Sequence, residues 1–444
     1  MNLDFAARRQ NLIAQLPAGS VALIASGAEQ IRNRDVDFPF RAESDFLYLT
    51  GFTEPDCVLV LIHQSVLEGS EYANGCHQAW LFLRPKDPLQ ETWQGRRLGV
   101  EAAPQTLAIN QAWSIDELDD IAPKFLSQAH QVYFSFGQLK DWSVKLADWL
   151  NGLKAQVRKG VAVPTGLCDL DSVLHEQRLI KSAQEIELMR QAAQISVQGH
   201  IAAMRATRPG AYEYQVQSAL EHAFKMAGSE RVAFNTIAAA GDNACILHYT
   251  ENNAPLKDGD LILLDAGAEW QGYAGDISHT FPINGRFSPA QKQLYELVLA
   301  AQQAAIAAVK PGNVYDAMHQ ASSRVITAGL VQLGILQGEV ETLVKDEAYK
   351  RFFMHGTGHW LGLDVHDVGR YKIDGQWRTL KPGMVVTIEP GLYIPLDAEG
   401  VDAQWRGIGI RIEDDVLVTQ SGHEVLTLGL PRRVEEIEQW MQQR

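Results

Sequence analysis

Acidic side chains occupy strand positions in this sequence where an apolar residue would normally stand. Asp265 ends the run LILLD, and on a strand it shares a face with Leu261 and Leu263. Glu389 closes the run VVTI, and Glu413 follows the alternating run IGIRI. An ionised carboxylate in such a place is costly unless it is paired or binds a cation. The chain must therefore fold so that each of these carboxylates meets a partner.

Strand geometry ties two of these acidic positions to their neighbours. Asp276 follows Asp265 past the segment EWQGY, and a hairpin there would place the two carboxylates side by side. In IGIRIED the three isoleucines face one way, whereas Gly409, Arg411 and Glu413 face the other. Taken by themselves, Arg411 and Glu413 would form a salt bridge at a sheet edge.

The segment FFMHGTGHWLGLDVHD, residues 352–367, contains His355, His359 and His366. A helix would put the first two on one face, as in the zinc motif H-E-x-x-H, but two glycines lie between them and no Glu follows the first. An extended or looped conformation is expected instead, with the glycines allowing a close approach of backbone or ligand. Any metal bound by these histidines would need further ligands from elsewhere in the chain.

Each of these residues alone has a simpler interpretation. A strand-end carboxylate is usually solvated or ion-paired, and a histidine is usually hydrogen-bonded in the core or at the surface. Taken together, however, four carboxylates and one imidazole form an oxygen-rich set, which favours manganese and leaves cobalt, iron(II) or zinc open. Five ligands suit two ions better than one. The candidate ligands are Asp265, Asp276, His359, Glu389 and Glu413.

A chain of 444 residues is too long for one ordinary core, so two domains are expected. The first part alternates strand-like runs with a helix, and the second begins with a long amphipathic helix in which Ser182 gives an N-cap signature. We predict an α/β (α+β) fold with a boundary between residues 174 and 175. The expected strands are 21–26, 57–63, 79–84, 131–137, 260–270, 273–281, 384–394 and 408–419, and the expected helices include 114–129 and 175–207.

The ordered set of acidic residues and histidine is similar to the signature of the pita-bread metallopeptidases, which include methionine aminopeptidase, prolidase and aminopeptidase P. The resemblance covers nearly the whole chain, through LLDAGAEWQGYAGDISHTF, HGTGHWLGLDVHDVG, PGMVVTIEPGLYI and GIGIRIEDDVLVT in order. The segment NRDVDFPFRAESDFLYLTGFTEPD, residues 33–56, and the segment HWLGLDVHD resemble aminopeptidase P more than prolidase. The resemblance implies an N-terminal domain of the aminopeptidase P type, 1–174, and a catalytic pita-bread domain, 175–444.

The resemblance implies a metal-dependent exopeptidase that releases the first residue of peptides with proline in the second position, by attack of a metal-bridging hydroxide. An X–Pro bond has no amide N–H and a fixed φ, so general aminopeptidases would handle it poorly. Two alternatives are a prolidase, which cuts only Xaa-Pro dipeptides, and a metal-free relative that acts like creatinase or as a binding module. Metal-free relatives lose the ligand carboxylates, and all of these are present here.

The resemblance also implies how the ligands are shared. Two divalent ions, with Mn²⁺ preferred, would be bridged by Asp276 and Glu413. Asp265 would complete the coordination of one ion, and His359 and Glu389 that of the other.

The same resemblance implies catalytic and substrate-binding roles. Glu389 would pass a proton to the leaving nitrogen. His248 and His366 match histidines that flank the substrate, and His355 matches a histidine on the leaving-group side. Arg411 would orient the carboxylates.

Trp93, in ETWQGRR, matches an aromatic residue that reaches a neighbouring subunit's site in this family. Its simpler interpretation is a tryptophan of the local core. The resemblance implies a homo-oligomer, a tetramer in the first instance or else a dimer.

Charge, hydropathy and cysteine content argue against several other classes of protein. The formal net charge of −15 argues against nucleic-acid binding. No run approaches eighteen apolar residues, which argues against a membrane span, and the N-terminus lacks the apolar core of a signal peptide. Four scattered cysteines without a C-x-x-C pair are typical of a reducing cytoplasm.

Overall fold

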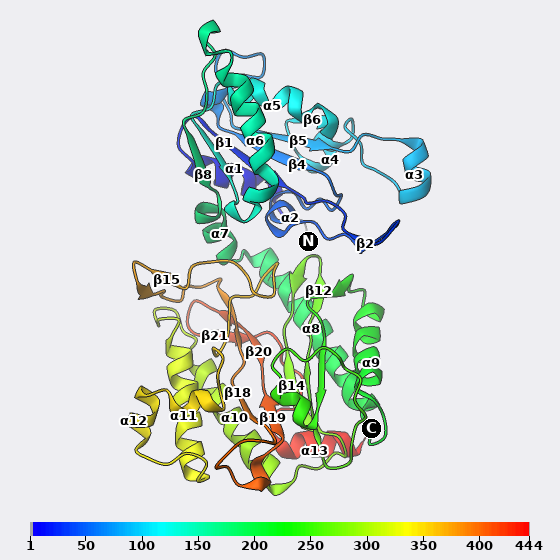
Figure 1. Ribbon diagram of the computed structural model, residues 1–444, viewed down its shortest axis with the longest axis vertical. Coiled ribbons are helices and arrows are strands. Elements are labelled where there is room, and N and C mark those ends of the chain that lie inside the picture. Colours follow the sequence, from blue (N-terminus) through cyan, green and yellow to red (C-terminus); the bar gives the residue numbers. More distant parts are fainter. Residues whose placement is uncertain (1–2, 444) are drawn as a thin grey trace. The chain divides into compact units, whose positions relative to one another are not determined.

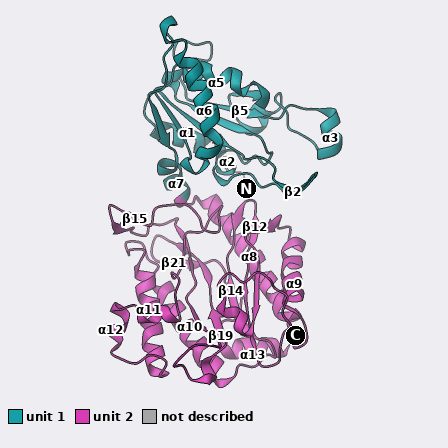
Figure 2. Cartoon of the chain, in the orientation of Figure 1, with its two compact units in different colours: residues 1–178 teal, residues 179–444 magenta. Residues whose placement is uncertain are grey.

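The computed structural model describes residues 3–443, and the chain divides into two compact units, residues 1–178 and 179–444 (Figure 2). Both units contain helices and strands, as the predicted α/β class requires. The division lies near the end of helix α7 (Asp171–Leu179). Among residues 3–443, no helix is long and apolar enough to cross a membrane.

Unit 1 is built on one mixed sheet with the strand order β6-β5-β4-β1-β7-β8 (Figure 1). β4 pairs antiparallel with β1 and β5, whereas the pairs β5–β6, β1–β7 and β7–β8 are parallel. The strands predicted in this part are present, and β6 and β8 are additional. Their bounds are β1 Ser20–Ala25, β4 Val58–Ile62, β5 Gln78–Leu83, β6 Gln111–Ser114, β7 Gln131–Phe134 and β8 Gly166–Asp169, and β2 Ile31–Asn33 and β3 Val36–Asp37 form a separate ribbon.

The core of unit 1 lies between this sheet and helices α5 and α6, where Phe125 and Trp142 pack with Val60 and Trp80. The helix predicted over 114–129 is shorter than expected, because Ser114 caps a 3₁₀ turn and the α-helix begins only at Leu118. The helices are α1 Phe5–Gln15, α2 Ser44–Thr50, α3 Pro88–Gln94, α4 Ala103–Leu107, α5 Leu118–Leu126 and α6 Leu139–Lys154.

Unit 2 places short antiparallel strands between two packed helix pairs, α8 with α9 and α10 with α11 (Figure 1). Its helices are α8 Ala183–Ala206, α9 Glu213–Met226, α10 Pro289–Ala308, α11 Ala317–Gln332, α12 Val340–Lys345 and α13 Val434–Gln442. Its strands are β9 Arg231–Val232, β10 Ile237–Ala240, β11 Leu261–Asp265, β12 Ala268–Trp270, β13 Tyr273–Ala274, β14 Ser278–Pro282, β15 Lys372–Ile373, β16 Gln376–Trp377, β17 Val385–Ile388, β18 Gly391–Ile394, β19 Ile408–Arg411, β20 Asp414–Val418 and β21 His423–Val425.

The prediction of one long helix over 175–207 is wrong, because α7 ends at Leu179 and α8 begins at Ala183. The Ser182 hydroxyl caps α8 as expected. Lys181 leaves the helical path, since its N–H donates to the carbonyl of Gly383 (2.9 Å) and its Nζ pairs with the buried Asp367 carboxylate (2.8 Å). These long-range contacts break the helical pattern of the sequence.

All four predicted strands of unit 2 are each divided in two, and the run 273–281 breaks around Asp276. The run 260–270 breaks at Gly267, where a Cβ would lie 1.6 Å from the carbonyl oxygen of Gly275. The runs 384–394 and 408–419 break around Glu389 and Glu413. Three predicted ligands, Asp276, Glu389 and Glu413, therefore lie at breaks between strands.

Candidate active site

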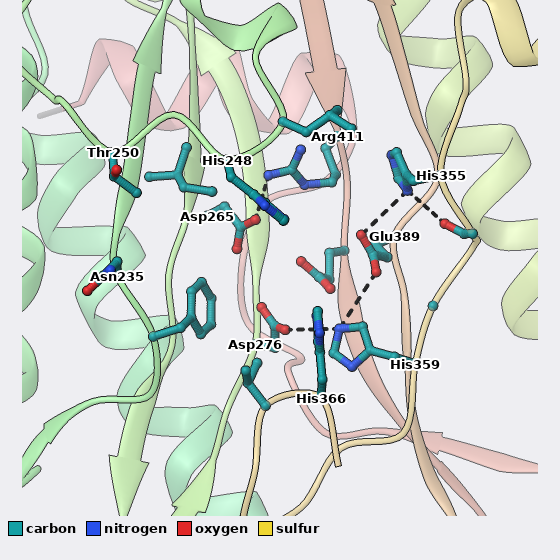
Figure 3. A pocket seen from close by; sticks show the side chains of 17 residues that line it. Asn235, His248, Thr250, Asp265, Asp276, His355, His359, His366, Glu389 and Arg411 are labelled. Carbon is teal, nitrogen blue, oxygen red and sulfur yellow. Dashed lines mark hydrogen bonds and ion pairs between the residues drawn. The ribbon is translucent and has the colours of Figure 1, made fainter. Parts of the chain in front are cut away.

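Unit 2 contains a cavity of about 590 Å³ at the ends of several of its strands (Figure 3). Every predicted site residue except Trp93 lines it. The structure thus brings together Asp265, Asp276, His359, Glu389, Glu413, His248, His355, His366 and Arg411.

Strand pairing explains how the acidic side chains meet. Asp265 ends β11 and is paired in register with Ser278 of β14, while β12 and β13 form the predicted hairpin between Asp265 and Asp276. Arg411 of β19 is paired in register with Gly391 of β18, two residues after Glu389. The same register sets the isoleucines of β19 in the hydrophobic core and Arg411 in the cavity.

Two of the carboxylates are buried, and two have an oxygen without a hydrogen-bond partner. Asp276 is 4% exposed and Glu413 2% exposed. Glu413 Oε2 accepts a bond from the Ser278 hydroxyl (2.8 Å), but Asp265 Oδ1 and Asp276 Oδ1 have no hydrogen-bond partner among the described residues. Unpaired buried anionic oxygens are costly, so the group of carboxylates requires a positive partner.

Repulsion between the carboxylates also indicates that they require a positive partner. Burial raises the pKa of Asp276 well above its usual range, and the negative charges of Asp265, Asp415 and Glu389 raise it further. Burial likewise raises the pKa of Glu413, and the negative charges of Asp276 and Glu389 raise it further. A bound cation would reverse this effect and keep both groups ionised.

His359 directs one ring nitrogen at these acids. Its Nδ1 lies 3.0 Å from the carbonyl oxygen of Trp360, which can only accept, so Nδ1 carries the proton and Nε2 has a free lone pair. Nε2 lies 3.5 Å from Asp276 Oδ2 and 3.7 Å from Glu389 Oε1. One ligand atom each from Asp276, His359 and Glu413 lie within 4.8 Å of one another. This donor set fits a divalent metal ion.

Arg411 is 4% exposed, so the simpler interpretation of an edge salt bridge with Glu413 is wrong. Its guanidinium pairs with Asp265 Oδ2 (2.5 Å) and donates to the hydroxyls of Ser278 (2.8 Å) and Tyr393 (3.0 Å). Arg411 therefore fixes one carboxylate directly and Glu413 through Ser278.

His355 lies beside Glu389 and is held in one tautomer. Its Nδ1 donates to the carbonyl of Gly356 (2.7 Å) and lies 3.8 Å from Glu389 Oε2, while Nε2 meets the Tyr393 hydroxyl (2.8 Å). Burial lowers the pKa of His355 to about 3, and the positive charge of Arg411 adds to this effect. His355 is therefore neutral at physiological pH.

His366 packs against His359, with ring centroids 4.2 Å apart. Burial lowers the pKa of His366, and the neighbouring His359 and His248 lower it further. Figure 3 shows His248 above the carboxylates and His366 below them, on two sides of the cavity.

The looped conformation predicted around the histidines is confirmed, since residues 352–367 contain no helix. We call residues 355–359 the histidine loop. A Cβ on Gly358 would lie 1.8 Å from the carbonyl oxygen of Thr387, so this position requires glycine. The N–H of His359 donates to the Thr387 hydroxyl (3.0 Å), which holds the loop against β17.

Sequence reasoning missed several residues of the site. Ser278 and Tyr393 bond Arg411, and Phe234, Asn235 and Thr250 line the cavity. Strand register could have identified Ser278, which pairs with Asp265, but the wall residues lie in irregular segments that carry no periodic signal.

Trp93 lies on α3 in unit 1 and is 81% exposed. The interpretation of a local core tryptophan is therefore wrong. Its predicted contact with a neighbouring subunit stays a prediction.

Comparisons with known proteins come from sequence and structure. Residues 187–420 match metallopeptidase family M24, and residues 5–133 match the aminopeptidase P N-terminal domain. The chain is 47% identical to a Xaa-Pro aminopeptidase of Haemophilus influenzae, over 99% of this chain and 97% of that protein. The structure of a Pseudomonas aeruginosa aminopeptidase is similar with a TM-score of 0.95 and 48% identity, over 99% of this chain and 98% of that one. Escherichia coli aminopeptidase P, solved with the inhibitor Pro-Leu, has a TM-score of 0.94 and 43% identity, over 99% and 98% of the two chains.

Proposed function

The chain belongs to metallopeptidase family M24, in which it is a metallo-exopeptidase of the aminopeptidase P type with a pita-bread catalytic domain, and from that premise we propose how its cavity works. Its substrates are peptides with proline in the second position, and aminopeptidase P is favoured over prolidase. The observation that carries the proposal is the pair of buried oxygens without a hydrogen-bond partner, Asp265 Oδ1 and Asp276 Oδ1, in the cavity that also holds the free Nε2 of His359.

We propose two divalent ions, and manganese as the metal, because four carboxylates and one imidazole form a hard, oxygen-rich donor set. Asp276 and Glu413 would be shared by both ions, Asp265 would serve one, and His359 and Glu389 the other. Bound metal would supply Lewis acidity and an activated water. The mutual proximity of Asp276, His359 and Glu413 ligand atoms supports this arrangement.

Glu389 is the residue proposed to move the proton. Burial raises the pKa of its carboxyl, and the nearby charge of Asp265 adds to this effect. A carboxylate with a raised pKa can take a proton during attack and give it to the departing proline nitrogen. A departing amide nitrogen must gain a proton to leave as an amine, and here the product is the secondary amine of proline.

The three histidines outside the ligand set would hold the substrate. His248 and His366 would donate to the carbonyl oxygen of the scissile bond as its charge develops. His355, whose neutral ring is held by Gly356 and Tyr393, would line the leaving-group side. Arg411 would act on the carboxylates rather than on the peptide, because its donors are already committed to Asp265, Ser278 and Tyr393.

The proposal also covers assembly and location. We propose a homotetramer, with a dimer as the second possibility, in the cytoplasm. An indole that is 81% exposed on α3 supports a role for Trp93 at a neighbouring subunit. Light scattering on the wild type and on Trp93→Ala, beside activity, tests whether the tryptophan serves assembly, the site or neither.

The main test combines metal analysis with peptide assays. Chelated protein is titrated with Mn²⁺ and assayed on an Xaa-Pro-Yaa tripeptide, an Xaa-Pro dipeptide and an Xaa-Ala-Yaa tripeptide. We expect about two ions per chain, activity only in the metal-loaded protein, and cleavage of the Xaa-Pro-Yaa peptide above both others. Full activity of rigorously metal-free protein, or a preference for the dipeptide, would overturn the proposal.

A further inference from the structure

Helix α11 contributes no side chain to the lining of the cavity, yet it contacts the histidine loop from outside. Tyr315, just before α11, donates to the carbonyl oxygen of Gly358 (2.5 Å). His319 and Ser322, on α11, both bond the hydroxyl of Thr357, at 2.9 and 2.6 Å. The loop that carries His355 and His359 is therefore fastened to this helix.

Thr357 occupies the centre of the histidine loop and is 3% exposed. Its carbonyl oxygen accepts the N–H of Glu389 (2.7 Å). The placement of Thr357 thus sets the backbone of a third site residue in addition to the two histidines beside it. A displacement of Thr357 would move groups on both sides of the proposed metal site.

The hydrogen bonds around His319 form a chain that links Tyr349, His319, Thr357 and Ser322. One arrangement satisfies every group: the Ser322 hydroxyl donates to the His319 carbonyl (3.1 Å), and the Thr357 hydroxyl donates to Ser322 Oγ. Thr357 Oγ1 can then accept only from His319 Nδ1–H, and His319 Nε2 must accept from the Tyr349 hydroxyl (3.0 Å). In this arrangement each donor is used, and His319 is neutral with its proton on Nδ1.

The environment of His319 maintains that neutral form. Burial lowers the pKa of the imidazole. The ring also packs against Phe353, with centroids 5.5 Å apart, and Phe353 meets the ring of His355 edge-on at 5.0 Å. His319 thus contacts the histidine loop both through Thr357 and through an aromatic neighbour.

We propose that His319 is a positioning residue for the active site: its Nδ1–H fixes Thr357, and Thr357 fixes the histidine loop and the backbone of Glu389. The inference rests on the proposed function, because the loop matters for catalysis only if His359 and Glu389 bind metal. His319 touches neither substrate nor metal ligand directly. Its effect reaches the site through one hydroxyl and one peptide carbonyl.

The test compares two replacements that keep different parts of the imidazole. His319→Phe keeps the ring and its contact with Phe353 but removes both nitrogens. His319→Asn keeps an N–H donor near the position of Nδ1. Tyr349→Phe is the matched control, because it removes the partner of Nε2 and leaves the contact between Nδ1 and Thr357 in place.

We expect His319→Phe to weaken Mn²⁺ binding to chelated protein and to lower kcat on an Xaa-Pro-Yaa peptide, each on the order of tenfold, with a smaller change in KM. His319→Asn should recover most of both losses, and Tyr349→Phe should lie close to the wild type. Thr357→Val, which removes the hydroxyl and keeps the shape, should reproduce the effect of His319→Phe and replaces it if that variant does not fold.

Equal losses in the Phe and Asn variants would overturn the proposal. So would a fall in melting temperature alone, with metal affinity and kcat unchanged, because His319 would then only fill space. The metal titration needs no substrate. A wild-type protein that binds Mn²⁺ but cleaves no Xaa-Pro-Yaa peptide would count against the proposed function and leave the comparison of His319 variants intact.

Discussion

Two regions of unit 2 bury carboxylates in opposite ways. At the start of α9, Glu213 is fully buried and all its acceptor capacity is used: Oε1 accepts from the N–H of Ala240 (2.8 Å) and from Asn243 Nδ2 (3.0 Å), and Oε2 accepts from the Tyr249 hydroxyl (2.9 Å) and the N–H of Ala254 (2.8 Å). In the cavity, Asp276 is about as deeply buried, but its Oδ1 has no hydrogen-bond partner within residues 3–443.

The difference teaches that burial of an acid does not by itself mark a functional site. The donors around Glu213 come from the protein, so that carboxylate stabilises the fold and joins α9 to the segment that carries His248 and Thr250. The acids in the cavity have too few donors and repel one another. Unused acceptor capacity, rather than burial, indicates where a cation belongs.

The strongest test of whether the cavity binds metal is to replace its histidines one at a time. His359→Ala should lose metal as well as activity, since Nε2 is the nitrogen that faces the acids. His366→Ala should keep its metal and lose roughly 10²–10³-fold in kcat, because a donor aimed at the developing oxyanion acts chiefly in the transition state.

His355→Ala should also keep its metal, with a smaller loss weighted towards substrate binding. Metal content and steady-state kinetics on one Xaa-Pro-Yaa peptide decide the matter for all three variants. If His366→Ala loses metal as readily as His359→Ala, the cluster is instead a multi-histidine metal site, for which zinc is the better ion.

Removing one charge from the acidic group is the next test. Glu413→Gln keeps size and the bond to Ser278 but offers less charge to the metal. We expect a loss of activity on the order of a hundredfold, because the repulsion between two cations is then poorly offset. The measurement is kcat/KM at ordinary metal concentration, and near-normal turnover would mean that Glu413 is not shared by the ions.

The same substitution at Glu213 should affect stability instead. Glu213→Gln turns one acceptor into a donor that faces other donors, so the free energy of unfolding should fall by about 1–3 kcal/mol. Metal stoichiometry should not change. Urea denaturation beside metal analysis checks both, and a loss of activity at constant stability, as expected for Glu413→Gln, would contradict the distinction between the two regions.

The smallest expected effect is on pH dependence. In metal-free protein, burial and neighbouring charges raise the pKa of Asp276 and Glu413, so the native state holds protons that the unfolded chain has released. The free energy of unfolding contributed by these groups must then fall as pH rises from about 4 towards neutrality.

Thermal unfolding of chelated protein across this pH range provides the measurement. Asp276→Asn, which cannot ionise, should flatten the decline, and Mn²⁺ should remove it in the wild type. An equally steep decline in Asp276→Asn would show that other groups cause it.

The sequence predicted the acidic residues of the cavity better than the residues that hold the surrounding segments in place. Asp265, Glu389 and Glu413 could be recognised because each interrupts an apolar run, which is a local signal. Glu213 has no such signal, since an acid in the first turn of a helix is ordinary and its donors lie 27–41 residues away. His319 and Tyr393 were missed for the same reason.

Long-range contacts also explain the errors of secondary structure. The amphipathic period runs from α7 into α8 without a pause, and only the contacts of Lys181 with Gly383 and Asp367 break it. A tryptophan such as Trp93 is expected to join the local core, but α3 has no buried side chain. Periodicity reports which face of an element is apolar, and it does not report which distant segment will meet that face.

Gly358 limits how such a site can be varied by mutation. Every other amino acid would bring a Cβ into the carbonyl of Thr387, and that carbonyl belongs to the strand that leads to Glu389. A randomised library across residues 355–359 would therefore return glycine at 358 in every active clone, whichever metal or peptide is selected for. Substitutions that change specificity can be made at cavity-lining residues such as Phe234 or Thr250. They cannot be made at Gly358.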